Sequence, residues 1–439
     1  MVGAAAIMVG TLIAPSAVVA ADASAGPVTD PAACGTDPIT LVTVDVEGGN
    51  PGPTAAIDQL YAEFMAMYPN VTIERVKTAY NDLVAKQPLD LSGPNPPDLT
   101  QIVGDNKAFA EYGNQGLILK LDDYAARYGW TERSGAAQLF NSSFDENGQI
   151  GTGSLYGVPQ VQEVVGLFYN KEKLAQLGLE LPTTWEDFLA SLDAAKTAGE
   201  IPMMLGNVEG WPAGHVYAMA YNRFVPTAVI NGWTYHTDPS ASFDSAGFRD
   251  ASALLQQWGT GGYLTPDFNS VSYDDAWKRF TEGEGLYLPA GSWLTGGIQE
   301  AMGDKGGFFL APPSQQNPAL QVEGGPGQAW AISAGSEHPD CAAALIDFMT
   351  SERGGEILIE NNVPPGFTMS NVPELGAGAY ADLIAALQDV NREYQVSAYE
   401  GTATPTIGEV IRAGNAAVLA GRMTPEDFVK SVQAEYEKG

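Results

Sequence analysis

Basic residues, histidine and cysteine are scarce in this 439-residue chain. Lys and Arg number 21 against 53 Asp and Glu, which gives a formal net charge of −32, and only 3 histidines and 2 cysteines occur. A chain of this charge is repelled by phosphate backbones and by anionic lipid surfaces, which excludes nucleic acid as a partner. Few histidines and no clustered cysteines leave no set of zinc ligands, so we expect no metal and no cofactor.

Signatures of common catalytic and nucleotide sites are absent as well. The sequence has no GxxxxGK phosphate loop, no HExxH helix and no GxSxG turn. We therefore expect neither ATP hydrolysis nor zinc-peptidase or nucleophilic-hydrolase chemistry of these types. An extracellular glycoside hydrolase needs only a pair of carboxylates, and it is the alternative among enzymes because acidic residues are so frequent.

Apolar runs long enough to span a bilayer are missing beyond the N-terminal stretch. Residues 2–20 carry no charge and are followed by small residues, so residues 1–21 are predicted to be an export signal peptide, although the usual basic start is missing. Residues 22–37 are rich in Ala, Pro, Asp and Gly and are predicted to form a flexible leader. We expect an exported protein that is extracellular or associated with the cell surface.

The two cysteines are Cys34 and Cys341. In an exported chain an even count favours a disulfide, which would join the start of the mature protein to a segment late in the chain. The alternative is a lipid anchor on Cys34, because Ala32-Ala33-Cys34 resembles the end of a lipobox. Pro31 stands where that motif has a branched apolar residue, and a disulfide uses both cysteines, so we favour the disulfide.

The rest of the chain alternates between strand and helix patterns. The run at 39–49 (ITLVTVDVEGG) reads as a buried strand, 55–68 as an amphipathic helix, and 71–76 and 97–103 as further strands. This alternation predicts βαβ units with a parallel sheet covered by helices. The length exceeds what one hydrophobic core usually organises, so we expect two domains.

Four blocks of sequence carry a resemblance to a known family. They are PDLTQIVGDNKAFAEYGNQGLILKLDDY, YGVPQVQEVVGLFYNKEKLAQLGLELPTTWEDF, EGEGLYLPAGSWLTGGI and QAWAISAGSEHPDCAAALIDFMTSERGGE. In this order they resemble the carbohydrate-binding proteins of ABC importers, the maltose-binding-protein-like solute-binding family, from about Ile39 to Lys438. The second block is the most specific, with its Gly-X-Pro strand entry, Tyr-Asn-Lys strand end and Pro-Thr-Thr-Trp helix cap.

The resemblance implies an α/β fold of the periplasmic-binding-protein type. Two lobes, each a mostly parallel sheet flanked by helices, would be joined by crossing strands near residues 160–165, 310–313 and 357–365. The implied division assigns residues 38–161 and 313–356 to lobe I and residues 162–312 and 357–439 to lobe II. Both cysteines then belong to one lobe, as a disulfide requires.

A sugar-binding site needs aromatic rings for the apolar sugar faces and polar groups for the hydroxyls. By position in the family's motifs, Asp105 and Glu163 are implied to accept hydroxyl hydrogen bonds, and Trp293 is implied to stack on the sugar. Trp211, in the loop EGWPAGH, is a second expected stacking surface. For Asp105, the other interpretation is a cap on the helix that follows it.

Further candidates are chosen by their place in loops or beside glycines. They are Glu47, Asn106, Gln162, His215, Gly324, Gly325, Tyr399 and Glu400. Glu47 and Gln162 have an equally good interpretation as solvated surface groups. The glycine pair would let backbone approach a ligand closely.

The resemblance implies a binding protein and not an enzyme. It would capture an oligosaccharide between its lobes by hinge closure and deliver it to the transmembrane subunits of an ABC permease, acting as a monomer. Besides the hydrolase, the alternative is a receptor for another solute such as a peptide or a polyamine.

Overall fold

The β-branched run predicted as the first strand begins a mixed sheet. β1 (Ile39–Asp45) pairs in parallel with β2 (Val71–Lys77) and with β3 (Leu99–Ile102). β11 (Ala329–Ile332) joins β3 antiparallel and β6 (Val158–Pro159) joins β11, so the order is β2-β1-β3-β11-β6. The computed structural model describes residue 30 and residues 32–104, 106–370 and 372–438.

A second sheet is built around β7 (Gln162–Asn170), which is buried from its second residue onward. β10 (Gln321–Pro326) pairs with its first residues, while β8 (Tyr287–Gly291) and β9 (Gly306–Phe309) pair with later ones, all antiparallel. β12 (Gln395–Ser397) joins β10 in parallel. Continuous burial explains why β7 reads as an apolar run and not as an alternating strand.

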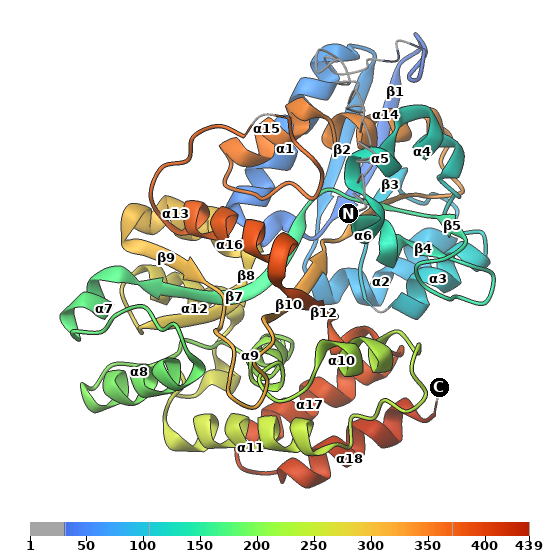
Figure 1. Cartoon of the computed structure of the whole chain (residues 1–439). Coiled ribbons are helices and arrows are strands. Elements are labelled where there is room, and N and C mark those ends of the chain that lie inside the picture. The colour runs from blue at the N-terminus through green and yellow to red at the C-terminus, as the bar shows by residue number, and fades with distance from the viewer. Residues whose placement is uncertain (1–29, 31, 105, 371, 439) are drawn as a thin grey trace, which may run out of the picture.

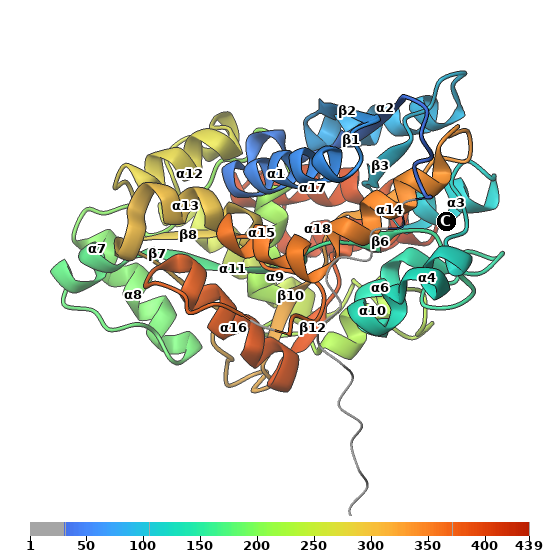
Figure 2. The same ribbon diagram turned by 90° about the horizontal axis from the view of Figure 1, so that it is seen from above.

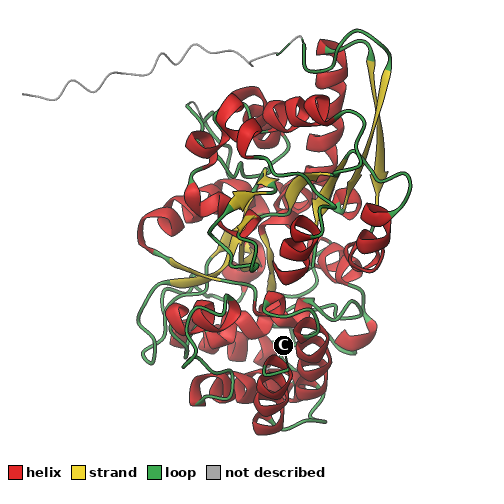
Figure 3. Cartoon of the chain, turned by 90° about the vertical axis from the view of Figure 1, so that its right-hand side faces the viewer, coloured by secondary structure: helices red, strands yellow, loops and turns green. Residues whose placement is uncertain are grey.

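Helices form the outer layers around both sheets (Figure 3). In the first lobe they are α1 (Pro51–Met67), α2 (Tyr80–Ser92), α3 (Asn106–Asn114), α4 (Asp122–Tyr128), α5 (Trp130–Ser134), α6 (Ala136–Leu139), α14 (Pro339–Met349) and α15 (Glu352–Glu360), with the hairpin of β4 (Ser143–Phe144) and β5 (Ser154–Leu155). In the second lobe they are α7 (Lys171–Gln176), α8 (Trp185–Thr197), α9 (Pro212–Tyr221), α10 (Thr227–Thr234), α11 (Ala246–Gly261), α12 (Tyr273–Thr281), α13 (Thr295–Met302), α16 (Ala379–Glu393), α17 (Ile407–Leu419) and α18 (Pro425–Tyr436).

The Pro-Thr-Thr-Trp motif begins α8, as the sequence predicts. The side-chain oxygen of Thr184 accepts a hydrogen bond from the backbone N–H of Asp187 at 3.1 Å and so caps the helix. Such a cap contributes about 1 kcal/mol. Trp185, the last residue of the motif, is buried in the core of the second lobe and is therefore a packing residue.

Each sheet lies in its own lobe (Figure 1). The blue and cyan elements of the first lobe, together with orange α14 and α15, occupy the upper part of the view, and α9, α11, α17 and α18 occupy the lower part. The first lobe has a core that includes Leu41, Phe64 and Trp330, whereas the second lobe has two cores of its own. The predicted two-lobed α/β fold is confirmed.

Besides the connection from β10 to β11 at residues 327–328, the chain crosses between the lobes at two neighbouring segments, 160–161 and 364–366. Only residues 160 and 161 separate β6 of the first sheet from β7 of the second. The backbone N–H of Gly366 donates to the carbonyl of Gln160 at 2.9 Å, and Val161 forms a bridge with Pro365. The two crossing segments are therefore hydrogen-bonded to each other, and they fix where β7 leaves the first lobe.

The lobes also touch through helices. Figure 2 shows α1 of the first lobe beside α13 of the second. A Cβ atom on Gly296 would lie only 2.6 Å from the Cα of Gly52, so glycine at these positions lets the two backbones meet.

The predicted exchange points between the lobes at residues 162, 313 and 357 stay predictions. If sheet and core membership define the lobes, the return to the first lobe comes later than residue 313, and the second departure from it comes later than residue 357. β10 pairs with β7 in the second sheet, whereas Ile357, Leu358 and Val363 pack into the core of the first lobe.

The predicted disulfide is present. Cys34 is bonded to Cys341 at the start of α14, and both lie in the buried core of the first lobe. Because the sulfur of Cys34 is engaged in this bond, it does not carry a lipid in this structure. Among the described helices, none combines the length and the apolar character that a bilayer-spanning segment needs. The predicted signal peptide and residues 22–29 and 31 of the leader lie outside the described residues.

Removing the disulfide should destabilise the first lobe. In the double variant Cys34→Ser/Cys341→Ser the free energy of unfolding should fall by about 2–4 kcal/mol, because the unfolded chain is no longer held in a closed loop. Thermal unfolding of the variant, beside oxidised and reduced wild type, measures this. Equal melting of the variant and the oxidised wild type would contradict the expectation.

Candidate functional site

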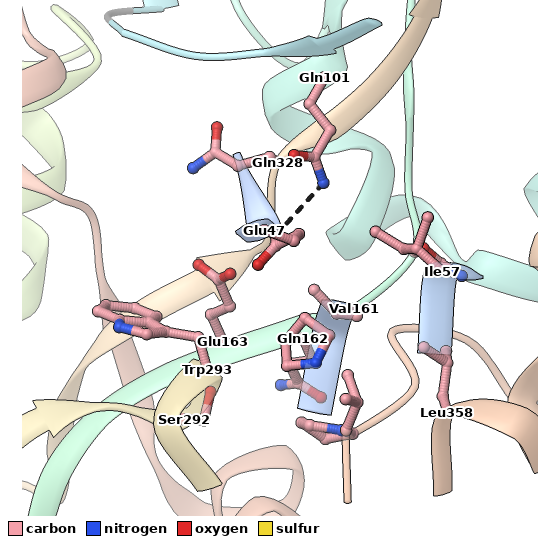
Figure 4. Close-up of a pocket in the computed structure, with 14 residues that line it drawn as sticks. Glu47, Ile57, Gln101, Val161, Gln162, Glu163, Ser292, Trp293, Gln328 and Leu358 are labelled. Atoms are coloured by element: carbon pink, nitrogen blue, oxygen red, sulfur yellow. Dashed lines mark hydrogen bonds between the residues drawn. The ribbon is translucent and has the colours of Figure 1, made fainter. Parts of the chain in front are cut away.

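Side chains from both lobes surround a small cavity at the crossing segments (Figure 4). The cavity measures about 20 Å³, which is room for a group the size of one water molecule. Its walls are formed by Glu47, Pro53, Ile57, Gln101, Gln160, Val161, Gln162, Glu163, Ser292, Trp293, Gln328, Leu358, Val363 and Pro364.

Glu47 enters the cavity from the first lobe. It lies in the short helix Glu47–Gly49 that follows β1 and is buried. Its carboxylate accepts hydrogen bonds from Asn50 at 3.1 Å and from Gln101 at 3.4 Å. Burial raises the pKa of Glu47, and the neighbouring Asp45 adds to that rise, while the two hydrogen bonds oppose it. The interpretation of Glu47 as a solvated group is wrong.

Glu163 enters the cavity from the second lobe, at the start of β7. Only 8% of it is exposed, yet its carboxyl group has no hydrogen bond and no ion pair with any described residue. Burial raises the pKa of Glu163 to about 8, and the charge of Glu47 contributes to the rise. Figure 4 shows the two carboxyl groups directed toward each other, with Trp293 beside Glu163.

Aromatic rings form a wall next to this pair. Trp293 lies in the helical turn Ser292–Leu294 after β8, and its indole N–H donates to the hydroxyl of Tyr273 at 2.8 Å. Trp211, at the N-terminus of α9, has its ring centroid 4.5 Å from that of Tyr273 and 6.2 Å from that of Trp293. A side chain at position 291 would overlap the Trp293 ring at 2.0 Å, so Gly291 allows the indole to fold back over the strand end.

A second group of acidic residues lies beyond the indoles. His215 Nδ1 is 2.7 Å from a carboxylate oxygen of Glu323, and Glu323 is hydrogen-bonded to Glu400, which accepts a hydrogen bond from the Tyr221 hydroxyl at 2.8 Å. Burial, together with the charge of Glu323, raises the pKa of Glu400 to about 8. Burial also lowers the pKa of His215 to about 4, so its imidazole is neutral near pH 7.

The remaining described candidates border these groups. The Tyr399 ring centroid lies 6.0 Å from that of His215, and its hydroxyl is buried without a hydrogen-bond partner among the described residues. Gly324 and Gly325 of β10 pair with Val164 and Glu163. Gln162 lines the cavity and donates a hydrogen bond to Asn391 at 3.3 Å.

Two predicted residues cannot be placed. Asp105 lies outside the described residues, and Asn106 is described only as the first residue of α3. The other ten predicted residues lie in one connected region. They are Glu47, Gln162, Glu163, Trp211, His215, Trp293, Gly324, Gly325, Tyr399 and Glu400.

Sequence reasoning missed several side chains of this region, and four of them make hydrogen bonds within it. They are Gln101, Tyr221, Tyr273 and Glu323. Glu323 had a readable signal, because an acidic residue inside an otherwise apolar strand run, directly before two glycines, is unusual. The other three lie on ordinary strand or helix patterns and become site residues only through tertiary contacts. No cluster of His, Cys, Asp and Glu suited to a metal ion occurs among the described residues.

The raised pKa of Glu163 should make stability depend on pH. An acid whose pKa rises from 4.5 to about 8 on folding binds a proton more tightly in the folded state, so stability is lost as pH rises between these values. Glu163→Gln, which cannot ionise, should therefore be more stable than wild type, by a margin that grows by about 1–3 kcal/mol from about pH 6 to about pH 8.5. Unfolding measured at both pH values tests this. The exposed residue Glu300 on α13 provides the control Glu300→Gln, which should follow wild type at each pH.

Several known proteins are similar to this chain in sequence or in architecture. The chain is 24% identical over 318 residues to the multiple sugar-binding protein of Streptococcus mutans, which covers 71% of this chain and 72% of that protein. A chitin oligosaccharide binding protein superposes with a TM-score of 0.79 at 19% identity, covering 92% of this chain and 99% of the other. A structure titled SBP RafE in complex with raffinose superposes with a TM-score of 0.71 at 19% identity, covering 91% and 99%.

A family-wide match covers most of the described chain. Residues 48–356 match the family described as bacterial extracellular solute-binding protein, which includes the cavity residues of β7 and the Ser292–Leu294 turn. The match spans more than half of the chain, and the two-lobed fold agrees with it. The chain therefore belongs to the bacterial extracellular solute-binding proteins.

Proposed function

We propose that this protein is the receptor of an ABC importer, which captures an oligosaccharide between its lobes and delivers it to the transmembrane subunits of a permease. The observation that carries the proposal is the meeting of indole rings (Trp211, Trp293) with buried carboxyl groups from opposite lobes (Glu47, Glu163). Indole faces suit the C–H faces of sugar rings, and carboxylates accept hydrogen bonds from hydroxyls. The names of the similar proteins, which refer to sugars, chitin oligosaccharide and raffinose, support the same ligand class.

Binding would work by hinge closure. Each lobe contributes one part of the site, so a ligand that touches both parts lowers the free energy of the closed arrangement only. Glu47 and Gln101 would act from the first lobe, and Glu163 with Trp293 from the second. The adjacent crossing segments at 160–162, 327–328 and 364–366 would serve as the hinge, because they connect the lobes and meet at the cavity.

The predicted site residues become part of this proposal. Asp105, implied by the resemblance, and Asn106, chosen by its loop position, would also contact the ligand, because β3 ends just before them and Gln101 of that strand lines the cavity. Tyr399 and Glu400 would contact the far end of the ligand, near His215. The closed form would act as a monomer, and the surface created by closure would be read by the permease.

We propose further that the protein performs no chemistry on its ligand. The rival function is glycoside hydrolysis, for which the buried carboxyl pair is the only motivating feature. Turnover distinguishes the two: a hydrolase releases new reducing ends from an oligosaccharide, whereas a receptor returns it intact. Release of reducing sugar that depends on Glu163 would favour the hydrolase.

Replacing the stacking indole should abolish ligand stabilisation. In a thermal-shift screen against oligosaccharides, wild type should melt higher with its ligand, because the ligand binds only folded protein. Trp293→Ala should weaken affinity by about 30-fold or more and so lose most of that shift, while the ligand-free melting temperature changes little because the indole is partly exposed.

The matched control is Tyr263→Ala in the second lobe, whose ring lies over Lys196 and outside the candidate site. It should retain the full ligand-induced shift. An unchanged shift in Trp293→Ala would mean that the indole does not contact the ligand.

A further inference from the structure

The polar lining of the cavity contains acidic side chains and no basic side chain. It comprises two carboxyl groups, Glu47 and Glu163, four glutamine amides and the Ser292 hydroxyl, and none of its lining residues is Lys, Arg or His. The amides belong to Gln101, Gln160, Gln162 and Gln328. Glutamine can donate or accept hydrogen bonds to a ligand, but it cannot neutralise a carboxylate.

The basic residue that acts on Glu47 does not neutralise the pair of Glu47 and Glu163. Arg75 acts on Glu47 electrostatically, but its guanidinium is already bonded to Asp45 and to Asp58, at 2.7 Å in each case. Glu163 has no basic partner at all among the described residues. A carboxyl group that is more than nine-tenths buried normally has donors, because an unpaired one loses its hydration without replacement.

The second acidic group differs in this respect. Glu323 and Glu400 are hydrogen-bonded to each other and are also bonded to His215 and Tyr221. Both carboxyl groups therefore have hydrogen-bond partners within the protein. Glu163 points into the cavity with no hydrogen-bond partner among the described residues, so a ligand that supplies charge would supply it there.

The cavity size restricts what can enter. About 20 Å³ holds one group of water size, which is a single ring substituent and not a ring. Trp293 lines the same cavity, so a ring stacked on its indole could extend one substituent between the carboxyl groups. A hydroxyl would bring one donor and no charge, whereas an ammonium group brings three donors and one positive charge.

We propose that the oligosaccharide captured by this receptor carries a protonated amine, on an amino-sugar or aminocyclitol unit, and that its ammonium group lies between Glu163 and Glu47 while its ring stacks on Trp293. This inference rests on the proposed function and names its ligand class. An ammonium group between the two carboxyl groups lowers the pKa of Glu163 again, so both groups ionise and accept charge-assisted hydrogen bonds, which are stronger than neutral ones. The overall charge of −32 attracts such a ligand and repels uronic acids and sugar phosphates.

The test compares saccharides that differ only in the ring substituent. Calorimetric titrations of the mature protein near neutral pH use β-1,4-linked glucosamine oligomers, the matched N-acetylated oligomers and the matched glucose oligomers. An α-1,4-linked set with and without an amino substituent is measured in parallel. We expect the tightest ligand to bear a free amine and to lose affinity on the order of 10- to 100-fold when the amine is acetylated or replaced by a hydroxyl.

Two variants assign the preference to one carboxyl group. Glu163→Gln should bind amine-bearing and neutral saccharides with similar affinity, and its thermal melting, measured alongside, should match or exceed that of wild type because an uncharged amide replaces a buried acid. Glu300→Gln removes a carboxylate from the exposed surface of α13 and should retain the full preference.

The outcomes separate this inference from the proposed function. Tightest binding of a neutral saccharide would overturn the inference and leave the oligosaccharide receptor standing, with Glu163 acting as a protonated hydroxyl donor. Persistence of the amine preference in folded Glu163→Gln would also overturn it. Failure of every saccharide to bind would overturn both proposals.

Discussion

The site depends on where β7 crosses between the lobes. This strand continues from β6 after two residues, pairs with β10 at its start and with β8 and β9 further on, and is hydrogen-bonded at its entry to the second crossing segment. Glu163 is its second residue, so the pairing that joins the lobes also fixes a carboxyl group at their junction. Residues of the loop after β8 and of β10 are placed around it by the same sheet.

Electrostatics gives this junction its chemical character. Glu47, Glu163, Glu323 and Glu400 are all buried, and burial raises the pKa of each. Proteins seldom bury unpaired acids for stability, because each costs free energy when it ionises. Their concentration beside partly exposed indoles is what distinguishes a binding site from ordinary core packing.

Much of the fold could be predicted because its signals are local. β-branched runs, the Thr184 cap and the spacing of the four sequence blocks identify strands, a helix start and the family, and position within the blocks identified Glu163 and Trp293. The features that could not be predicted depend on contacts between distant parts of the chain. Tyr273 and Gln101 become site residues through partners far away in sequence, and the exchange of β10 into the second sheet has no local signal.

The order of the first sheet has a consequence for how the protein assembles during export. β11, which lies between β3 and β6, and Cys341, which is bonded to Cys34, both come from the last third of the chain. A chain emerging N-terminus first therefore cannot complete its leading lobe until the strands β7, β8 and β9 of the trailing lobe have already passed through the translocon. The earliest-emerging lobe becomes covalently locked only after Cys341 has emerged, so oxidation of the cysteine pair reports the arrival of all but the last 98 residues.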